Sequence, residues 1–145
     1  MKIRRGKLSD AKKILKILKE TPELSGSRDE EVVYTPQFVN GALTHPDRDL
    51  VLIAEENEKI IGFLIAELWE HKEYSYLIDI YIKQEFRRQG IASKLFKEYE
   101  KYCKNNKMNV IVGLVLVENV RMQKWCDKHE IKQGNKFYLY EKQLK

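Results

Sequence analysis

The stretch YLIDIYIKQEFRRQGIASKLFKEYEK, residues 76–101, decides the fold. Apart from Asp79, its first seven residues are apolar or aromatic and include three isoleucines, which predicts a strand. A turn containing Gly90 follows, and apolar residues then recur at helical spacing, which predicts a helix over residues 90–105. The N–H groups at a helix start have no partner inside the helix, and the helix dipole adds positive charge there. We therefore predict a phosphate or diphosphate site at residues 87–93.

The composition predicts one globular domain spanning residues 1–145. Hydrophobic residues make up 43% of the chain and charged residues 34%, as expected for a domain that buries its own core. The longest apolar run, residues 110–117, is too short for a membrane span, and no apolar segment follows the basic N-terminus as it would in a signal peptide. Cys103 and Cys126 lack metal-ligand spacing and do not make a disulfide framework. We therefore expect free thiols, no metal site and a cytoplasmic location.

Charge is spread unevenly along the chain, whose net charge is +5. Residues 83–107 carry eight basic side chains against three acidic ones, whereas residues 20–31 carry five acidic ones against Arg28 alone. A basic segment suits an anionic ligand and an acidic segment suits a cationic one, although a solvated surface would explain either pattern. We expect no nucleic-acid partner, because the aromatic residues of the basic helix fall on its apolar stripe rather than on a stacking surface.

The other patterns predict a mixed α/β fold. Strands are expected at residues 1–5, 50–55, 60–68 and 76–82, and the short turns between the last three predict an antiparallel meander. A first helix, capped by Ser9, is expected to end at Thr21-Pro22. Three more helices are expected over residues 36–43, 90–105 and 120–128. The apolar run 110–117 predicts a strand buried on both faces and parallel to residues 76–82. A last strand is expected over residues 136–141.

The order of these elements and the residues of the turn resemble the GNAT superfamily of acyl-CoA-dependent N-acetyltransferases over nearly the whole chain. The family motif Arg/Gln-x-x-Gly-x-Gly/Ala, between its fourth strand and third helix, corresponds to RRQGIA at residues 87–92. The apolar strand ending at Ile82, the aromatic Phe86 and the run ending near Asn119 support the match, whereas Gln84 replaces the family's usual proline. The resemblance implies a single GNAT domain with a mixed central sheet of about six to seven strands, parallel splayed fourth and fifth strands, and about four helices.

The resemblance also implies acetyl-CoA as the co-substrate. In the family the pyrophosphate of coenzyme A lies on the N–H groups of the turn, and the pantetheine arm adds to the fourth strand like an extra strand. The coenzyme-binding residues implied here are Ile80, Tyr81, Ile82, Arg87, Arg88, Gln89, Gly90, Ile91, Ala92, Ser93 and Asn119. The Gly-x-x-x-x-Gly-Lys-Ser/Thr phosphate loop is absent, and only one of the three glycines of a dinucleotide site is present.

The implied reaction is attack of a neutral amine on the acetyl thioester, with a main-chain N–H near residues 81–82 binding the carbonyl oxygen. The tyrosine that the family often uses as an acid is missing. Counting from Asn119, its position holds Cys126, whose ordinary pKa of about 8.5 is close to that of a leaving thiol. The structural alternative is a small buried cysteine. Tyr138 or Tyr140 are alternative phenols, and a third possibility is that the coenzyme A thiolate leaves without a dedicated acid.

Asp79 is the candidate for the amine side of the reaction. An acid in an otherwise apolar strand is unfavourable unless it is paired or faces a polar cleft. The strand is similar to that of family members that act on polyamines and other small amines, where an acid at this position lies near the acceptor. We therefore expect Asp79 to hold the substrate ammonium or to receive its proton through water. The alternative is a structural ion pair or hydrogen bond, and Glu67 is the second candidate.

The resulting hypothesis is an N-acetyltransferase acting on a small-molecule or peptide amine, with a cationic amine favoured by the acidic residues 20–31. The alternative is a coenzyme A-binding module that no longer catalyses. It is supported by the missing tyrosine and by Glu130-Ile131, where the family has Gly-Phe. The resemblance also allows a homodimer, and we expect no membrane partner.

Overall fold

The structure is a computed structural model that describes residues 1–21, 34–138, 140, 142 and 144. The chain divides into two units, Met1–Gly113 and Leu114–Lys145, and each unit is described on its own. Most of the acidic segment that favours a cationic acceptor, residues 22–31, lies outside the described residues.

The first unit is built on a five-stranded sheet with the strand order β1-β2-β3-β4-β5. The strands are β1 Lys2–Arg5, β2 Asp49–Glu56, β3 Lys59–Trp69, β4 Tyr74–Ile82 and β5 Val110–Gly113. Strands β1 to β4 pair antiparallel with their neighbours, and β5 pairs parallel to β4. The predicted antiparallel meander and the predicted parallel strand–helix–strand unit are confirmed.

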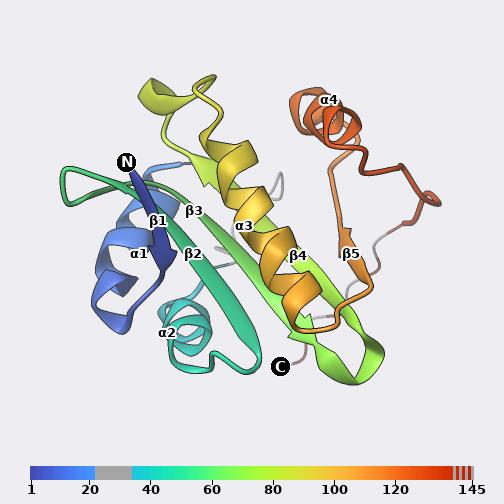
Figure 1. The fold of residues 1–145 in the computed structure, drawn as a ribbon, viewed down its shortest axis with the longest axis horizontal. Coiled ribbons are helices and arrows are strands. Elements are labelled where there is room, and N and C mark those ends of the chain that lie inside the picture. Colours follow the sequence, from blue (N-terminus) through green and yellow to red (C-terminus); the bar gives the residue numbers. More distant parts are fainter. Residues whose placement is uncertain (22–33, 139, 141, 143, 145) are drawn as a thin grey trace. The chain divides into compact units, whose positions relative to one another are not determined.

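Helices cover both faces of this sheet (Figure 1). Helices α1 Ala11–Glu20 and α2 Pro36–Thr44 lie on one face, and α3 Ile91–Asn105 crosses the other. The α1/α2 side buries a core cluster whose centre includes Ile14, Val39, Val51, Ile53, Phe63 and Ile65. The odd-numbered residues of the middle of β2 and β3 therefore face α1 and α2, and the even-numbered ones face α3.

A buried chain of hydrogen bonds joins α3 to the sheet. The Tyr99 hydroxyl donates to Ser75 Oγ at 2.6 Å, and Ser75 Oγ donates to the Glu67 carbonyl at 2.7 Å. Both Tyr99 and Ser75 are fully buried, so their hydroxyls need these partners inside the protein. The chain fixes α3 over β3 and β4, and with it the Gly90 turn from which α3 starts.

Strand β4 contains a β-bulge at Ile78. In its pairing with β3, Asp79 opposes Ile65 but Leu77 opposes Ala66, so that Ile78 is an extra residue. A bulge disrupts the ladder locally, bends the strand and increases its twist.

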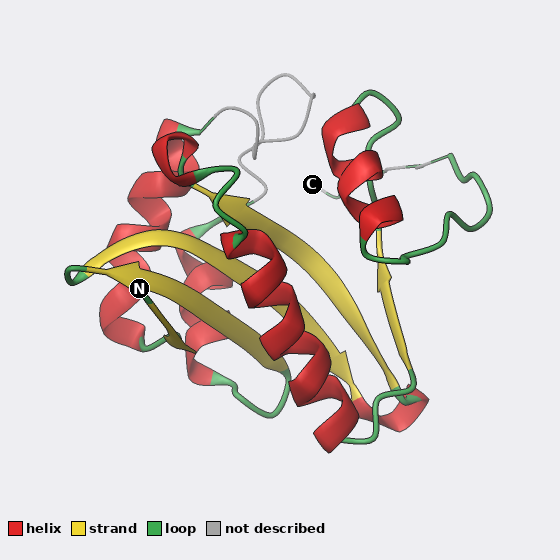
Figure 2. Cartoon of the chain, turned by 45° about the horizontal axis from the view of Figure 1, so that its top comes forward, coloured by secondary structure: helices red, strands yellow, loops and turns green. Residues whose placement is uncertain are grey.

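Strand β5 pairs with β4 only as far as this bulge. The parallel ladder begins where Tyr74 opposes Val110 and ends where Leu77 opposes Gly113. Beyond that point β4 continues, and it pairs with β3 alone among the described strands (Figure 2). The final part of β4 therefore lies at an open edge of the sheet.

The predicted number of six to seven strands is wrong for the part of the chain that the structure describes, which forms five strands. The apolar run 110–117 predicts a strand buried on both faces, but only β5 forms from it, and Val110 is 53% exposed and Val112 39%. The described residues of the expected last strand, 136–138 and 140, adopt no strand. An apolar run does not reveal whether a further strand covers it, so β5 forms as an exposed edge strand.

The second unit contains α4, Val120–Lys128, with the bounds that the sequence predicts. Asn119 caps this helix, because its Oδ1 accepts a hydrogen bond from the Met122 N–H at 3.0 Å. The Gln123 amide donates to the carbonyls of residues 116–117 at 3.1 and 2.7 Å. These bonds satisfy donors at the helix start and tie α4 to the segment before it.

No helix in the described ranges is long and apolar enough to cross a membrane. Cys103 and Cys126 are both free, and Cys103 is buried. Among the described residues, no group of three or more His, Cys, Asp or Glu side chains is placed to hold a metal ion.

Arg4 joins β1 to its neighbours through charge. Its guanidinium donates to Asp10 at 2.8 and 2.9 Å and to Glu55 at 2.6 and 2.9 Å. These hydrogen bonds hold the pKa values of both carboxyl groups below their ordinary range. Because Asp10 immediately precedes α1 and Glu55 lies on β2, Arg4 fixes the first helix against the sheet.

We predict that Arg4→Ala lowers the free energy of unfolding at pH 7 by about 2 kcal/mol, because the buried Asp10 carboxylate loses its cation. Lys2→Ala is the matched control. Lys2 also contacts Glu55, at 2.9 Å, but its side chain is 67% exposed, so we expect a loss below about 0.5 kcal/mol.

The loss of stability in Arg4→Ala should depend on pH in a defined direction. The depressed pKa of Asp10 in the folded protein gives stability that is present above the unfolded pKa and is lost as the pH falls through the folded pKa. The difference between wild type and Arg4→Ala should therefore narrow below about pH 4. Urea unfolding at several pH values measures it, and equal losses in the Arg4 and Lys2 variants would contradict the prediction.

Candidate active site

The turn that leads into α3 leaves its backbone open to the outside. Gly90 precedes α3 with φ of 74°, and Arg88 has φ of 62°. A Cβ added at Gly90 would meet no atom within 4 Å, so glycine suits this position because of its left-handed backbone and not because of crowding. The Lys94 N–H donates to the Gly90 carbonyl at 3.0 Å. The main-chain N–H groups of residues 91–93 therefore come before this first hydrogen bond of the helix, and the start of a helix favours a bound anion.

Arg87 fastens the turn to the end of β4. Its Nε donates to the Ile82 carbonyl at 2.9 Å, and its guanidinium carbon lies 5.8 Å from the centroid of the Tyr81 ring, within cation–π range. The Tyr81 hydroxyl accepts a hydrogen bond from Thr21 Oγ1 at 3.1 Å. Arg87 thus organises the junction between strand and turn, while residues 88–89 are exposed.

Strand β4 presents main-chain groups directly before this turn. In an antiparallel pair, alternate N–H and C=O groups point away from the partner strand. Residues 79–82 pair with β3 alone among the described strands, so these outward groups lie at an open edge. An extended ligand can add to such an edge like another strand. The predicted coenzyme-binding residues Ile80, Tyr81 and Ile82 all lie in this part of β4.

Asp79 forms a hydrogen bond with Tyr34. The Tyr34 hydroxyl donates to Asp79 Oδ2 at 2.5 Å; Tyr34 is buried and Asp79 is half-buried. Burial raises the pKa of Asp79 above its ordinary value, and the hydrogen bonds from the Tyr34 hydroxyl and the Ile80 N–H oppose that rise. Burial and the charge of Asp79 also raise the pKa of Tyr34, so the phenol stays protonated and donates. A carboxylate with a raised pKa is a better proton acceptor near neutral pH.

The bulge brings other polar side chains to the face of Asp79. Tyr76 and Asp79 are three residues apart and would face opposite sides of a regular strand. With Ile78 as an extra residue, Tyr76 opposes Glu67 and Asp79 opposes Ile65. All four of these paired side chains therefore lie on the α1/α2 side of the sheet, and both acidic candidates share one face.

Glu67 is surrounded by aromatic rings on this face. The Trp69 indole N–H donates to Glu67 Oε2 at 2.9 Å. The ring centroid of Trp69 lies 5.0 Å from that of Tyr74 and 6.4 Å from that of Tyr76, which is stacked on it. Carboxylates together with aromatic faces attract organic cations, so the surroundings of Glu67 and Asp79 suit an ammonium group.

The two remaining predicted residues belong to the second unit. Asn119 uses its Oδ1 to cap α4, and Cys126 lies half-buried within that helix. Burial, with the neighbouring Asp127 carboxylate, raises the pKa of the Cys126 thiol, which keeps it protonated at neutral pH. The roles of Asn119 in coenzyme binding and of Cys126 as an acid stay predictions. The alternative phenols, Tyr138 and Tyr140, are both exposed.

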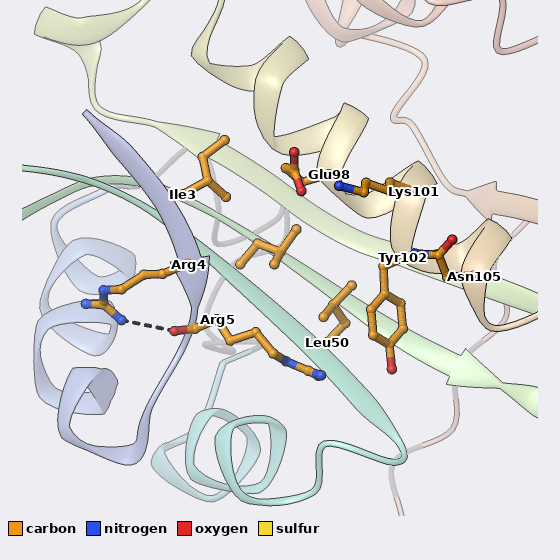
Figure 3. Close-up of a pocket in the computed structure, with 9 residues that line it drawn as sticks. Ile3, Arg4, Arg5, Leu50, Glu98, Lys101, Tyr102 and Asn105 are labelled. Carbon is orange, nitrogen blue, oxygen red and sulfur yellow. Dashed lines mark hydrogen bonds between the residues drawn. The ribbon is translucent and has the colours of Figure 1, made fainter.

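A cavity of about 260 Å³ lies away from these residues, on the α3 face of the sheet (Figure 3). Its lining consists of Ile3, Arg4, Arg5, Leu50, Leu52, Glu98, Lys101, Tyr102 and Asn105. The Arg5 guanidinium lies 5.2 Å from the centroid of the Tyr102 ring, within cation–π range. The sheet separates the cavity from Asp79, which faces α1 and α2, and none of the predicted site residues contributes to its lining.

Sequence reasoning missed Tyr34 as a site residue. Tyr34 lies 45 positions before Asp79 and directly before Thr35, whose Oγ1 caps α2 by accepting the Phe38 N–H at 3.1 Å. An aromatic residue beside a helix cap is typical of packing on the first turn, and the Tyr34 and Phe38 rings are indeed 5.5 Å apart. That local signal gives no indication of a partner on β4.

A comparison with protein families finds a match to the acetyltransferase (GNAT) family over residues 11–130. No curated protein matches the chain by sequence. Similar solved structures include PaiA N-acetyltransferase from Thermoplasma acidophilum in complex with coenzyme A, which is 19% identical with a TM-score of 0.78 and covers 88% of this chain and 87% of its own.

Two aminoglycoside acetyltransferases have the same fold. One, meta-AAC0020 from an uncultured soil metagenomic sample, is 18% identical with a TM-score of 0.78 and covers 99% of this chain and 96% of its own. The other, AAC(6')-IG from Acinetobacter haemolyticus, is 17% identical with a TM-score of 0.79 over 100% of both chains. At these identities the likeness shows the fold, and the family match shows the membership. The chain therefore belongs to the GNAT family of acetyltransferases, as the resemblance of its turn predicts.

Proposed function

We propose that this protein transfers the acetyl group of acetyl-CoA to a primary amine, on a small cationic molecule or on a protein, by direct attack of the amine on the thioester. The family uses acetyl-CoA, and a structure of the same fold is in complex with coenzyme A. One observation carries the proposal: the open edge of β4 runs directly into a left-handed glycine turn at the start of α3. Asp79 lies on the same strand and supplies the acidic group that an amine needs.

The residues present fit coenzyme A. The space over Gly90 is open, the positive end of a 15-residue helix follows, and the exposed Arg88 adds a cation; together these suit a diphosphate. The amides of an extended pantetheine arm suit the outward main-chain groups of residues 80–82. When bound, acetyl-CoA supplies the thioester whose carbonyl carbon the amine attacks.

We assign the amine side of the reaction to Asp79. As the nitrogen–carbon bond forms and the carbon–sulfur bond breaks, the amine proton passes to the Asp79 carboxylate, directly or through water. A main-chain N–H near residues 81–82 is proposed to bind the carbonyl oxygen as its charge develops. The sulfur leaves as a thiolate, to which Cys126 is proposed to donate a proton.

A cationic acceptor is favoured by the surroundings of Asp79. Glu67 and the rings of Trp69 and Tyr76 lie on the same face of the sheet, and such a combination attracts an ammonium group. Aminoglycoside acetyltransferases are among the proteins that share this fold, which agrees with a cationic amine without naming it. The competing hypothesis, a coenzyme A-binding module without catalysis, differs in one measurable outcome: binding without thiol release.

The coenzyme site is tested by thermal denaturation with and without acetyl-CoA. We expect acetyl-CoA to raise the melting temperature of the wild type, since a ligand that binds only the folded state stabilises it. Gly90→Glu should abolish this rise, because a carboxylate would stand against the diphosphate. Gly90→Gln is the matched control, with the same bulk and the same unfavourable left-handed backbone but no charge, and it should keep part of the rise.

The variants are compared by the change in melting temperature that acetyl-CoA causes in each, and not by the melting temperature itself. This is necessary because both substitutions at Gly90 should lower the stability of the unliganded protein by about 1 kcal/mol. No shift in the wild type, or an equal shift in the Glu variant, would contradict the proposed site.

The role of Asp79 is tested by thiol release from acetyl-CoA over a panel of polyamines, aminoglycosides and peptides. On the best acceptor we expect Asp79→Asn to lower kcat by about 10²-fold or more, as for loss of a general base, and to leave the melting shift with acetyl-CoA intact. Asp47→Asn, at an exposed turn before β2, should change neither quantity. Loss of the coenzyme shift in Asp79→Asn would mean that Asp79 is structural.

A further inference from the structure

The pair formed by Tyr34 and Asp79 connects β4 to the start of α2. Tyr34 is 6% exposed and its ring packs against the Phe38 ring, and the neighbouring Thr35 caps α2. The beginning of α2 therefore fixes the position of the phenol. The phenol in turn donates to Asp79 Oδ2 at 2.5 Å, which fixes one oxygen of the carboxylate.

We propose that Tyr34 is a positioning residue of the acetyl-transfer site, which holds the Asp79 carboxylate in one orientation toward the acceptor amine and stabilises its charged form. This inference rests on the role proposed above for Asp79. Tyr34 itself does not exchange a proton in it, because burial and the adjacent Asp79 charge keep its hydroxyl protonated.

The physical basis is the opposition between burial and hydrogen bonding. Burial disfavours the carboxylate and raises the pKa of Asp79, and the Tyr34 hydrogen bond is the largest effect that lowers it again. The groups that act on the pair come from two elements: Tyr34 from the segment before α2, and the Ile80 N–H and Tyr76 from β4. If the Tyr34 hydroxyl is removed, only the hydrogen bond from the Ile80 N–H counteracts the effect of burial on the carboxylate. The pKa of Asp79 should therefore rise further.

The test uses Tyr34→Phe, which removes the hydroxyl and keeps the ring against Phe38. Carbon NMR of the side-chain carboxyl groups in the full chain measures the pKa of Asp79 without a substrate, and the signal is assigned by its loss in Asp79→Asn. We expect the pKa in Tyr34→Phe to be higher by about one pH unit. Tyr102→Phe, on the α3 face of the sheet, is the matched control and should leave the pKa unchanged. Equal values in wild type and Tyr34→Phe would overturn the inference.

A second measurement connects the pair to catalysis. The pH profile of kcat/KM is recorded by thiol release with spermidine as the amine. Because the ionised carboxylate is needed, the acid limb of the profile in Tyr34→Phe should move to higher pH by the same amount as the carboxyl pKa. The plateau of kcat/KM at high pH should stay below that of the wild type, because the carboxylate is no longer held in one orientation. An acid limb at the same pH in wild type and Tyr34→Phe would overturn the inference, because the hydroxyl would then not stabilise the ionised carboxylate.

The outcome also separates this inference from the proposed function. If the wild type releases no thiol with any amine of the panel, the proposed acetyl transfer fails. The NMR titration then still decides whether Tyr34 holds and stabilises the Asp79 carboxylate.

Discussion

Strand β4 is an interior strand only as far as Leu77, where its ladder with β5 ends, and the extra residue Ile78 in its pairing with β3 follows immediately. Two features of the proposed site meet at this point of the strand. The end of β4 has main-chain groups at an open edge, immediately before the turn that starts α3. The change of register also brings Asp79 to the face of the sheet that carries Tyr76 and Glu67. In a regular strand, Asp79 and Tyr76 would lie on opposite faces. The proposed coenzyme site and the proposed amine site thus have a common origin in the backbone of one strand.

The two proposed functions are assigned to different parts of that strand. Coenzyme binding is assigned to main-chain groups and to the start of α3, where the buried Tyr99–Ser75 hydrogen bond and the Arg87–Ile82 contact fix the geometry. Amine binding is assigned to side chains on the α1/α2 face. A site made from main-chain groups needs few particular side chains, which agrees with a shared fold at 17–19% identity. The acceptor side depends on side chains, so it can differ from one family member to another.

Local signals explain which elements could be predicted. Helix α4 begins at the predicted residue because Asn119 supplies an acceptor for a helix N–H, and α2 begins at Pro36 because Thr35 does the same. Gly90 was identifiable because a left-handed residue before an amphipathic helix favours glycine. The strand count was not predictable in the same way. The apolar run at residues 110–117 carries no local information about its neighbours, and β5 proves to be a short edge strand with exposed valines.

The sequence by itself determined the family, the meander, the turn at Gly90 and the presence of an acid within an apolar strand, because each depends on spacing within a short stretch. It could not determine what pairs with Asp79. Tyr34 lies 45 residues away in sequence, and its hydroxyl reaches the carboxylate only because α2 packs on the sheet and the bulge turns Asp79 toward it. Tertiary structure alone decided that contact, since the free energy of a half-buried carboxylate depends on the groups brought to it from distant segments.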